Sequence, residues 1–254
     1  MAAVIENGLF RVLRNRVGRA IQEFQLLEEG DRVLVALSGG KDSWTLLHVL
    51  DALRRRAPVR YELVAATIDP GFPGFDADAI AAHCTEAGFA FVCERTEMSE
   101  ILRVKADPRK NPCALCARLR RGALYNLAER LGCTKIALGH HLDDVLETLL
   151  LNQFYGGTLG AMAPKLLSDD RRNTVIRPLV YVDEKQTASF ARRNGFPLVA
   201  CSCPATARPD GKRVRVKALV AALEREDRRI KRSLLRSLSN VQPRHLMDRR
   251  LWVD

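Results

Sequence analysis

The sequence predicts an α/β fold in which helices cover both faces of a parallel sheet. Short apolar runs, typical of buried strands, lie at residues 32–37, 61–68, 90–93 and 135–138. Segments of helical periodicity alternate with these runs, which is the pattern of strands joined by crossover helices. The 254 residues suffice for a sizeable core, and no apolar run is long enough to span a bilayer.

The helices are predicted from the spacing of apolar residues. An amphipathic helix opens the chain, with apolar residues at helical spacing from Leu9 to Phe24, and a turn follows at residues 28–31. A charged helix is expected near the other end of the chain, at residues 216–237. Residues 155–177 are rich in glycine and lack clear periodicity, so no element is expected there. The remaining helices are expected at residues 44–56, 76–87, 114–131, 142–154 and 183–194.

The charge balance indicates a polyanionic partner. Lys and Arg number 41 against 30 Asp and Glu, which gives a net charge of +11. Such an excess suits nucleic acid or an anionic membrane surface. Several basic clusters favour contact with a phosphate backbone, although a solvated face is the alternative for any charge run. They comprise Arg118, Arg120, Arg121, Lys165, Arg171, Arg172, Lys212, Arg213 and Arg215.

The cysteines indicate a reducing setting. Seven cysteines in a chain of this length are too few for a disulfide scaffold, and their number is odd. The first residues are amphipathic rather than a short apolar block, so no signal peptide is expected. We therefore expect a cytoplasmic protein, in which clustered cysteines bind metal or do chemistry.

A glycine-rich turn follows the first predicted strand. Residues 38–43 read Ser-Gly-Gly-Lys-Asp-Ser and lie between a buried strand and a helix start. Glycines let backbone N–H groups approach an anion, the helix N-terminus adds partial positive charge, and Lys41 adds a full charge. A strand-to-helix turn with no ligand would explain one glycine and one capping residue, but not two glycines, a lysine and two serines together. The turn therefore predicts a phosphate site, but Asp42 after Gly-Lys excludes the Walker A pattern, and G-x-G-x-x-G is absent.

Two thiols lie at the start of a predicted helix. Cys113 and Cys116 form a C-x-x-C, whose thiols can face one ion and whose thiolates the helix N-terminus favours. Zinc and an iron–sulfur cluster both suit this motif. Cys201 and Cys203 are the close pair further along the chain that offers another ligand. Three thiolates would leave one iron of a cubane cluster open, whereas four would close the site. Cys84, Cys93 and Cys133 are expected in the core.

Further polar residues are expected at the carboxyl ends of the strands, where open α/β sheets bind ligands. Gly139, His140, Asp143 and Asp144 lie between the strand at 135–138 and the next helix. Helix capping explains one of these carboxylates, and Asp144 is a candidate for Mg²⁺. Asp69 ends the second strand, where it either holds a nucleotide or starts the Pro-Gly turn that follows.

The chain resembles the tRNA 2-thiocytidine synthetase (TtcA) family of the PP-loop ATP pyrophosphatase superfamily. Nearly the whole chain carries the resemblance. The matching stretches are VGRAIQEF, EEGDRVLVALSGGKDS, CALCARLRRGALYNLAERLG, KIALGHHLDDVLETLLLNQFYGG, APKLLSDD, VIRPLVY and NVQPRHLMDRRLW.

The resemblance implies a Rossmann-like PP-loop fold, also called the adenine nucleotide alpha hydrolase fold, with N- and C-terminal helical extensions. It divides the chain into an N-terminal helical extension at residues 1–30, a PP-loop domain with the C-x-x-C insertion at 31–200, and a C-terminal cysteine loop with a basic helical tail at 201–254. It implies ATP binding by Ser38, Gly39, Gly40, Lys41, Asp42, Ser43, Gly139, His140 and Asp143. Beyond the resemblance, we expect Asp69 to contribute to the ATP site, and Lys41 and Asp42 to act in catalysis.

The resemblance also implies a [4Fe-4S] cluster on three catalytic cysteines. Two correspond to Cys113 and Cys116. The third lies in a later C-x-x-C, which is one residue shorter here. We favour Cys203, the second cysteine of the pair, with Cys201 as the alternative.

The resemblance implies ATP- and Mg²⁺-dependent thiolation of cytidine 32 in the tRNA anticodon loop, with AMP and pyrophosphate as products. The partners implied are tRNA and a sulfur donor such as a cysteine desulfurase or free sulfide, with no membrane. The oligomeric state is open, a homodimer included. Two alternatives remain. One is a PP-loop enzyme that adenylates another base, with zinc or a cluster at the cysteines. The other is a non-catalytic RNA-binding protein with a structural metal.

Overall fold

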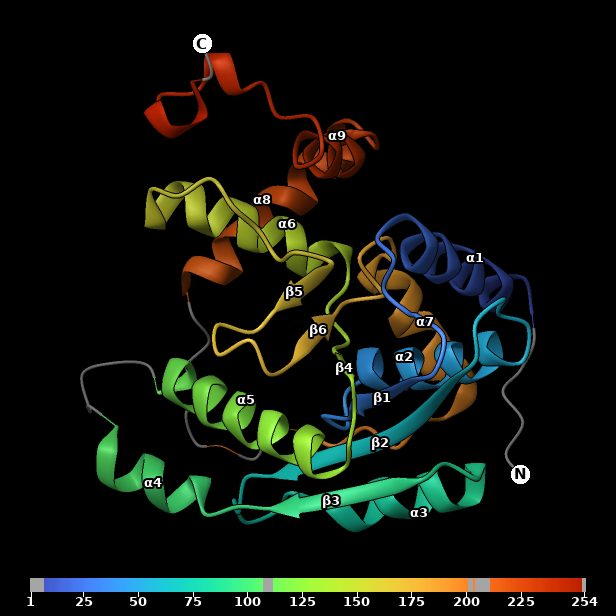
Figure 1. The fold of residues 1–254 in the computed structure, drawn as a ribbon. Coiled ribbons are helices and arrows are strands. Elements are labelled where there is room, and N and C mark those ends of the chain that lie inside the picture. Colours follow the sequence, from blue (N-terminus) through green and yellow to red (C-terminus); the bar gives the residue numbers. More distant parts are fainter. Residues whose placement is uncertain (1–6, 107–111, 201–202, 204–210, 253–254) are drawn as a thin grey trace. The chain divides into compact units, whose positions relative to one another are not determined.

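A six-stranded sheet forms the centre of the computed structural model, which describes residues 7–106, 112–200, 203 and 211–252 (Figure 1). The strand order is β3-β2-β1-β4-β6-β5. All neighbours are parallel except β5, which is antiparallel to β6. The predicted α/β class is therefore confirmed. The strands are β1 (Asp31–Ala36), β2 (Tyr61–Asp69), β3 (Phe91–Arg95), β4 (Lys135–Ala137), β5 (Lys165–Leu167) and β6 (Thr174–Ile176).

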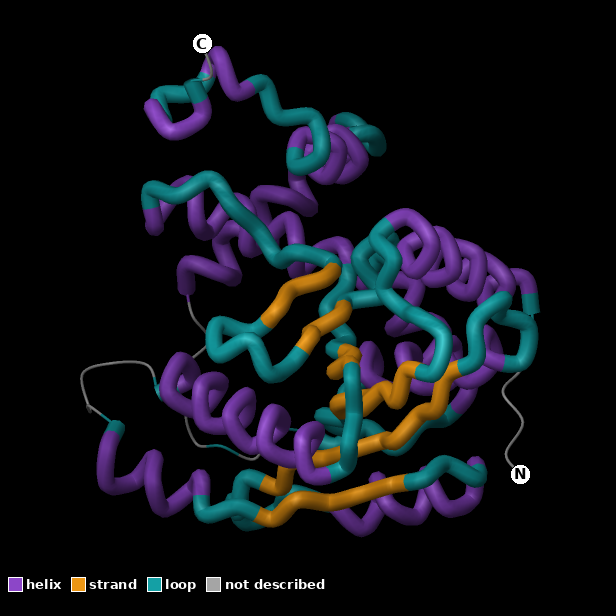
Figure 2. The backbone as a smooth tube through the Cα atoms, viewed as in Figure 1, coloured by secondary structure: helices purple, strands orange, loops and turns teal. Residues whose placement is uncertain are grey.

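Helices lie on both faces of this sheet (Figure 2). On one face α2 (Lys41–Arg54) packs against β1 and β2 and contacts α1 (Gly8–Glu23) and α7 (Glu184–Asn194). On the other face α5 (Cys113–Arg130) covers Leu34 and Ile136, which are paired in the register of β1 and β4. Alternate residues of a strand point to opposite faces, so β1 is apolar on both. The edge of the sheet carries α3 (Ala77–Ala87), and α4 (Met98–Lys105) lies beside α5.

Several local features differ from the sequence-based expectation, and helix α4 was not predicted. The sequence between residues 155 and 177 contains β5 and β6, which are too short to show a periodicity. The helix expected at 142–154 is α6 (Leu142–Leu151), followed by a π-helical turn at Asn152–Gly156. The single helix expected at 216–237 is two helices, α8 (Gly211–Glu226) and α9 (Ile230–Ser237). The break between them contains Asp227, whose side chain accepts a hydrogen bond from the Arg229 amide at 2.8 Å.

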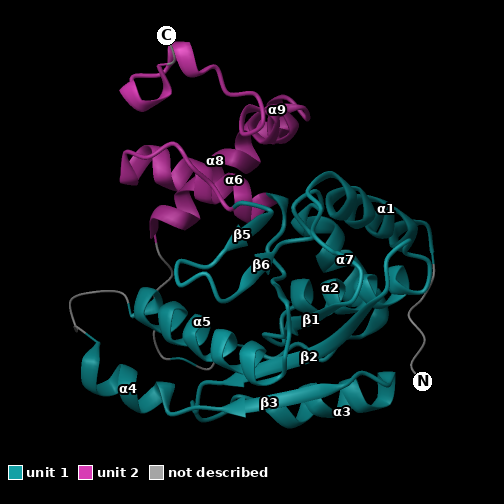
Figure 3. Ribbon diagram, viewed as in Figure 1, with its two compact units in different colours: residues 1–142, 163–210 teal, residues 143–162, 211–254 magenta. Residues whose placement is uncertain are grey.

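The chain forms two compact units (Figure 3). The first comprises residues 1–142 and 163–210 and holds the whole sheet. The second comprises residues 143–162 and 211–254, and Leu150, Val216 and Val220 form a small core in it. The division at residues 30/31 and 200/201 rests on sequence motifs and stays a prediction. Among the described helices, none has the length and apolar character needed to cross a membrane.

Candidate active site

The glycine-rich turn joins β1 to α2 at the carboxyl end of the strand. Helix α2 begins at Lys41, three residues before the predicted start, so Lys41, Asp42 and Ser43 form its first turn. The Ser43 hydroxyl donates to the Gly40 carbonyl at 2.9 Å, and the Gly40 amide donates to the Ser38 hydroxyl at 3.3 Å. These bonds hold the turn in place. The first amide groups of a helix lack intrahelical acceptors and carry partial positive charge, so the turn suits an anion.

Two glycines allow close packing around this turn. Gly39 has φ +76°, and its carbonyl accepts a hydrogen bond from the Val199 amide at 3.0 Å. A Cβ atom on Gly39 would lie 2.6 Å from the Cβ of Val199. Gly139, which follows β4, lies so close to α2 that a Cβ there would be 3.0 Å from the Ser43 amide nitrogen. Gly39 and Gly139, both predicted at the nucleotide site, therefore border the first turn of α2.

We expect Gly39→Ala to destabilise the protein more than Gly88→Ala. Both glycines have φ +76°, but a Cβ on Gly88 would have no atom within 4 Å. The left-handed backbone alone costs an alanine about 1–2 kcal/mol, and overpacking against Val199 adds about 1–3 kcal/mol. Urea unfolding of the two variants measures the difference. Equal losses of unfolding free energy would contradict the close packing of Gly39.

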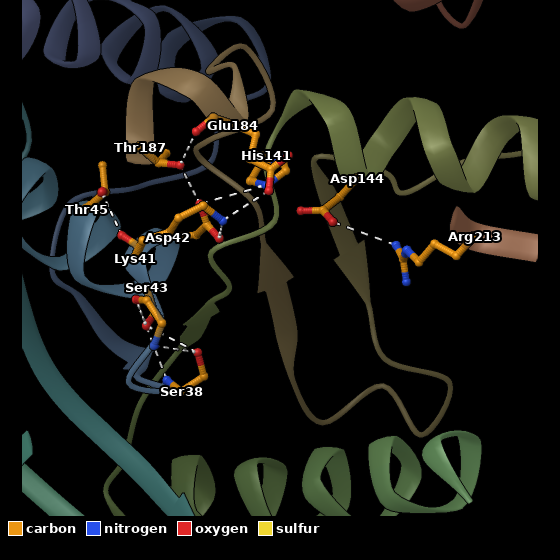
Figure 4. Close-up of polar contacts among 11 residues, drawn as sticks. Ser38, Lys41, Asp42, Ser43, Thr45, His141, Asp144, Glu184, Thr187 and Arg213 are labelled. Atoms are coloured by element: carbon orange, nitrogen blue, oxygen red, sulfur yellow. Dashed lines mark hydrogen bonds and ion pairs between the residues drawn. The ribbon is translucent and has the colours of Figure 1, made fainter. Parts of the chain in front are cut away.

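Lys41 is held by two carboxylates (Figure 4). Its Nζ atom lies 2.9 Å from Asp42 Oδ2 and 3.3 Å from Glu184 Oε1. Burial lowers the pKa of Lys41, but the hydrogen bonds and charges of Asp42 and Glu184 outweigh it, so the net shift is upward. The ammonium group is therefore present at neutral pH, beside the turn that suits an anion.

Asp42 connects Lys41 to two further elements. The Thr187 hydroxyl donates to Asp42 Oδ1 at 2.5 Å, and His141 Nε2 lies 3.8 Å from the same oxygen (Figure 4). Thr187 and Glu184 both belong to the first turns of α7, and His141 follows β4. Three elements distant in the sequence thus meet around the Lys41–Asp42 pair. Glu184 and Thr187 were not predicted, because acidic residues in a first helical turn are common and no motif marks either residue.

The other predicted edge residues have identified partners. Asp69 ends β2, and its Oδ1 accepts a hydrogen bond from the Gly71 amide at 2.8 Å, as expected of a turn residue. In the second unit Asp143 Oδ1 lies 2.6 Å from Lys231 Nζ, and Asp144 Oδ1 lies 3.7 Å from Arg213 Nη2. The assignment of His140 and Asp143 to ATP, and of Asp144 to Mg²⁺, stays a prediction.

The predicted metal-binding cysteines differ from the other cysteines in their surroundings. Cys113 is the exposed first residue of α5, and Cys116 and Cys203 are half-buried. By contrast, burial raises the pKa of Cys84 to about 12 and also raises the pKa of Cys93 and Cys133, which keeps these thiols protonated. Among the residues with described positions, no three His, Cys, Asp or Glu side chains are grouped to hold a metal. Cys201 lies outside those residues.

The predicted RNA-binding residues differ in their contacts. Lys165 pairs with Glu28, Arg172 with Asp170 and Glu129, and Arg213 with Glu147. The charges of these three are partly neutralised within their own units. Lys212 lies over the Tyr155 ring at 4.9 Å. The side chains of Arg118, Arg121, Arg171 and Arg215 are exposed.

Comparison with known proteins identifies the family. A family model described as a PP-loop domain matches residues 13–223. The tRNA-cytidine(32) 2-sulfurtransferase of Geobacter metallireducens is 58% identical over 247 residues, which cover 97% of this chain and 96% of that protein. This chain belongs to the tRNA-cytidine(32) 2-sulfurtransferase family. The predicted resemblance is thereby confirmed, and the chain is a sulfurtransferase enzyme with a PP-loop domain.

Further relatives agree with this assignment. The tRNA-cytidine(32) 2-sulfurtransferase of Syntrophotalea carbinolica is 57% identical over 245 residues, which cover 96% of this chain and 95% of that protein. Among solved structures, the fold is similar to that of a U34-tRNA thiolase, NcsA from Methanococcus maripaludis, determined with its [4Fe-4S] cluster. The TM-score is 0.72 at 23% identity, and the match covers 92% of this chain and 80% of that chain. This likeness concerns the fold alone.

Proposed function

We propose that this enzyme uses ATP to replace the C2 oxygen of cytidine 32 in tRNA with sulfur. The observation that carries the proposal is the 58% identity, over nearly the full length of both chains, to a tRNA-cytidine(32) 2-sulfurtransferase. The geometry supports it, because the turn after β1, which its own hydrogen bonds hold in place, and the Lys41 ammonium beside it are suited to bind phosphate. The first chemical step is then activation of the base by ATP.

In this step the C2 oxygen attacks the α-phosphorus of ATP. A bond forms between that oxygen and phosphorus, the bond to the bridging oxygen breaks, and pyrophosphate leaves. The amides at the start of α2 and the Lys41 ammonium stabilise the charge on the phosphates. Asp42 and Glu184 position Lys41 until ATP arrives. Mg²⁺ would be held by the phosphates, water and one carboxylate, for which Asp144 is the predicted residue.

The cysteines are proposed to hold a [4Fe-4S] cluster. The donor set fits, since Cys113 and Cys116 lie three residues apart at the start of α5, where the helix N-terminus favours thiolates. Cys203 belongs to the same compact unit and is the proposed third ligand, with Cys201 as the alternative. Such a cluster, when bound, supplies an open iron at which sulfur can be delivered.

The second step replaces oxygen with sulfur. A sulfide-level nucleophile attacks C2, the C2–oxygen bond breaks, and AMP leaves with the original oxygen. AMP is a far better leaving group than the oxide that would otherwise have to leave. The sulfur would come from free sulfide, or from the persulfide of a cysteine desulfurase after a thiol reductant has reduced it to the sulfide level. The target base must leave its stack to reach the site, which costs least in a single-stranded loop. The exposed arginines would contact the RNA backbone.

Incubation of the anaerobically purified enzyme with ATP, Mg²⁺, sulfide and unmodified tRNA tests this function. Mass spectrometry of the nucleosides should show 2-thiocytidine, with its position mapped to residue 32. A tRNA carrying uridine at position 32 serves as the control and should yield no thiolated nucleoside. Pyrophosphate release with sulfur on a different base would instead indicate a PP-loop enzyme with another target.

A further inference from the structure

Arg177 is a half-buried arginine directly after β6, at the same edge of the sheet as the glycine-rich turn. Its Nη1 donates to the Ala163 carbonyl at 2.6 Å. Its Nε is buried and has no hydrogen-bond partner among the described residues. Within that part of the chain no carboxylate forms an ion pair with it. A buried guanidinium with an unused donor is costly unless an anion completes its surroundings.

Helix α5 adds positive charge near Arg177. Arg121, Tyr125 and Glu129 follow one another at four-residue steps and therefore share one stripe of the helix. Glu129 joins this stripe to the β5–β6 hairpin through an ion pair of 3.0 Å with Arg172. The pKa of Arg177 is lowered by burial and by the charge of Arg121, against the opposing effect of Tyr125. The two arginines thus repel each other across this contact.

The same helix carries a second unused donor. Arg120 Nε is also buried without a partner in the described part of the chain. Arg120 follows Cys116 by four residues and Cys113 by seven, so the three share one face of α5. The rise from Cys116 to Arg120 is about 6 Å. Arg120 and Arg121 therefore lie within about two helical turns of the proposed cluster ligands on α5.

We propose that Arg177, together with Arg120 and Arg121, binds a phosphodiester group of the RNA next to the base that is modified. This inference rests on the proposed function. Guanidinium groups match phosphate oxygens in geometry and charge, and an anion would complete both unused donors. A phosphate of ATP is the alternative anion that these arginines could bind. The strand order favours RNA, because β6 lies two strands from β1, roughly 10 Å from the strand that leads to the ATP turn.

The test compares Arg177→Gln with Arg130→Gln in the protein, with an unmodified tRNA transcript as the probe. Arg130 lies on α5, as Arg120 and Arg121 do, but Glu94 already neutralises its charge through an ion pair of 2.6 Å, which makes it a matched control. Arg177→Gln should weaken tRNA binding about 10–100-fold. A plot of the logarithm of the tRNA association constant against the logarithm of the salt concentration should become less steep, by about 0.7–0.9. Arg130→Gln should change the tRNA affinity and the salt dependence by little. ATP affinity without tRNA should stay unchanged in both variants.

Unchanged tRNA affinity and salt slope in a folded Arg177→Gln protein would overturn the proposal. So would a loss of ATP affinity in the absence of tRNA, because the anion would then be a phosphate of ATP. If Arg177→Gln does not fold, the exposed Arg121→Gln replaces it and should show the same reduced slope. Binding is measured without turnover. A wild-type protein that makes no 2-thiocytidine would therefore contradict the proposed function, but the tRNA-binding comparison could still be interpreted.

Discussion

Replacement of Lys41 by methionine is expected to slow tRNA-dependent pyrophosphate release about 10²–10³-fold. The Lys41 ammonium lies at the start of α2, and its raised pKa keeps it charged across the neutral range. In the proposed reaction it stabilises the charge that develops on the phosphates. Methionine keeps much of the side-chain length and removes only the charge. Rapid-quench measurement of labelled pyrophosphate gives the rate directly.

Lys165→Met is the control for this experiment. The side chains of Lys41 and Lys165 are similarly exposed, at 28% and 33%, and both pair with glutamates. Lys165 contacts Glu28 and the Gln25 carbonyl and has no contact with the glycine-rich turn. At a tRNA concentration that saturates the enzyme, its variant should release pyrophosphate within a few-fold of the wild-type rate, because a loss of RNA affinity then has no effect. An equal loss of rate in both variants would contradict a catalytic role for Lys41. So would an unchanged rate in a Lys41→Met protein whose circular dichroism spectrum matches that of the wild type.

Replacement of Cys113 by serine is expected to abolish 2-thiocytidine formation while pyrophosphate release stays within about tenfold of wild type. The two steps use different parts of the enzyme, because adenylation depends on the turn after β1 and sulfur transfer on the cysteines. Iron and sulfide analysis after anaerobic purification should give about four of each per wild-type chain and little in the variant. The absorption band of the cluster should fall in parallel.

The matched control is Cys133→Ser, since burial keeps that thiol protonated and its side chain packs in the core under α5. It should retain iron and sulfide. Separate Cys201→Ser and Cys203→Ser variants identify the third ligand, because only one of them should lose the cluster. Stoichiometric zinc without sulfide in the wild-type protein would contradict the cluster and leave adenylation with another route for sulfur.

The sequence predicted the parts of the fold that have a strong local pattern. β1 and β2 are continuous apolar runs bounded by turn residues, and the structure confirms them. β5 and β6 have three residues each and are stabilised by pairing rather than by any local preference. The break between α8 and α9 depends on one Asp side chain that caps its own turn. Patterns of period 3.6 do not reveal such a break.

The site was predictable to the same extent. Residues 38–43 are contiguous, so the sequence alone indicates that they bind an anion. Gly139 was predicted from the motif in which it lies. Glu184 and Thr187 lie more than 140 residues from Lys41 and Asp42 in the sequence, and only the packing of α7 beside α2 brings them together. The unused donors of Arg120 and Arg177 depend on burial, which composition and spacing do not report.

The most direct test of the central claim follows the C2 oxygen of cytidine 32. A tRNA labelled with ¹⁸O at that oxygen is converted in a single turnover with ATP, Mg²⁺ and sulfide, and the AMP is analysed by mass spectrometry. Adenylation of the C2 oxygen predicts one ¹⁸O atom in the phosphate of each AMP formed with 2-thiocytidine. AMP without the label, formed together with 2-thiocytidine, would contradict the account.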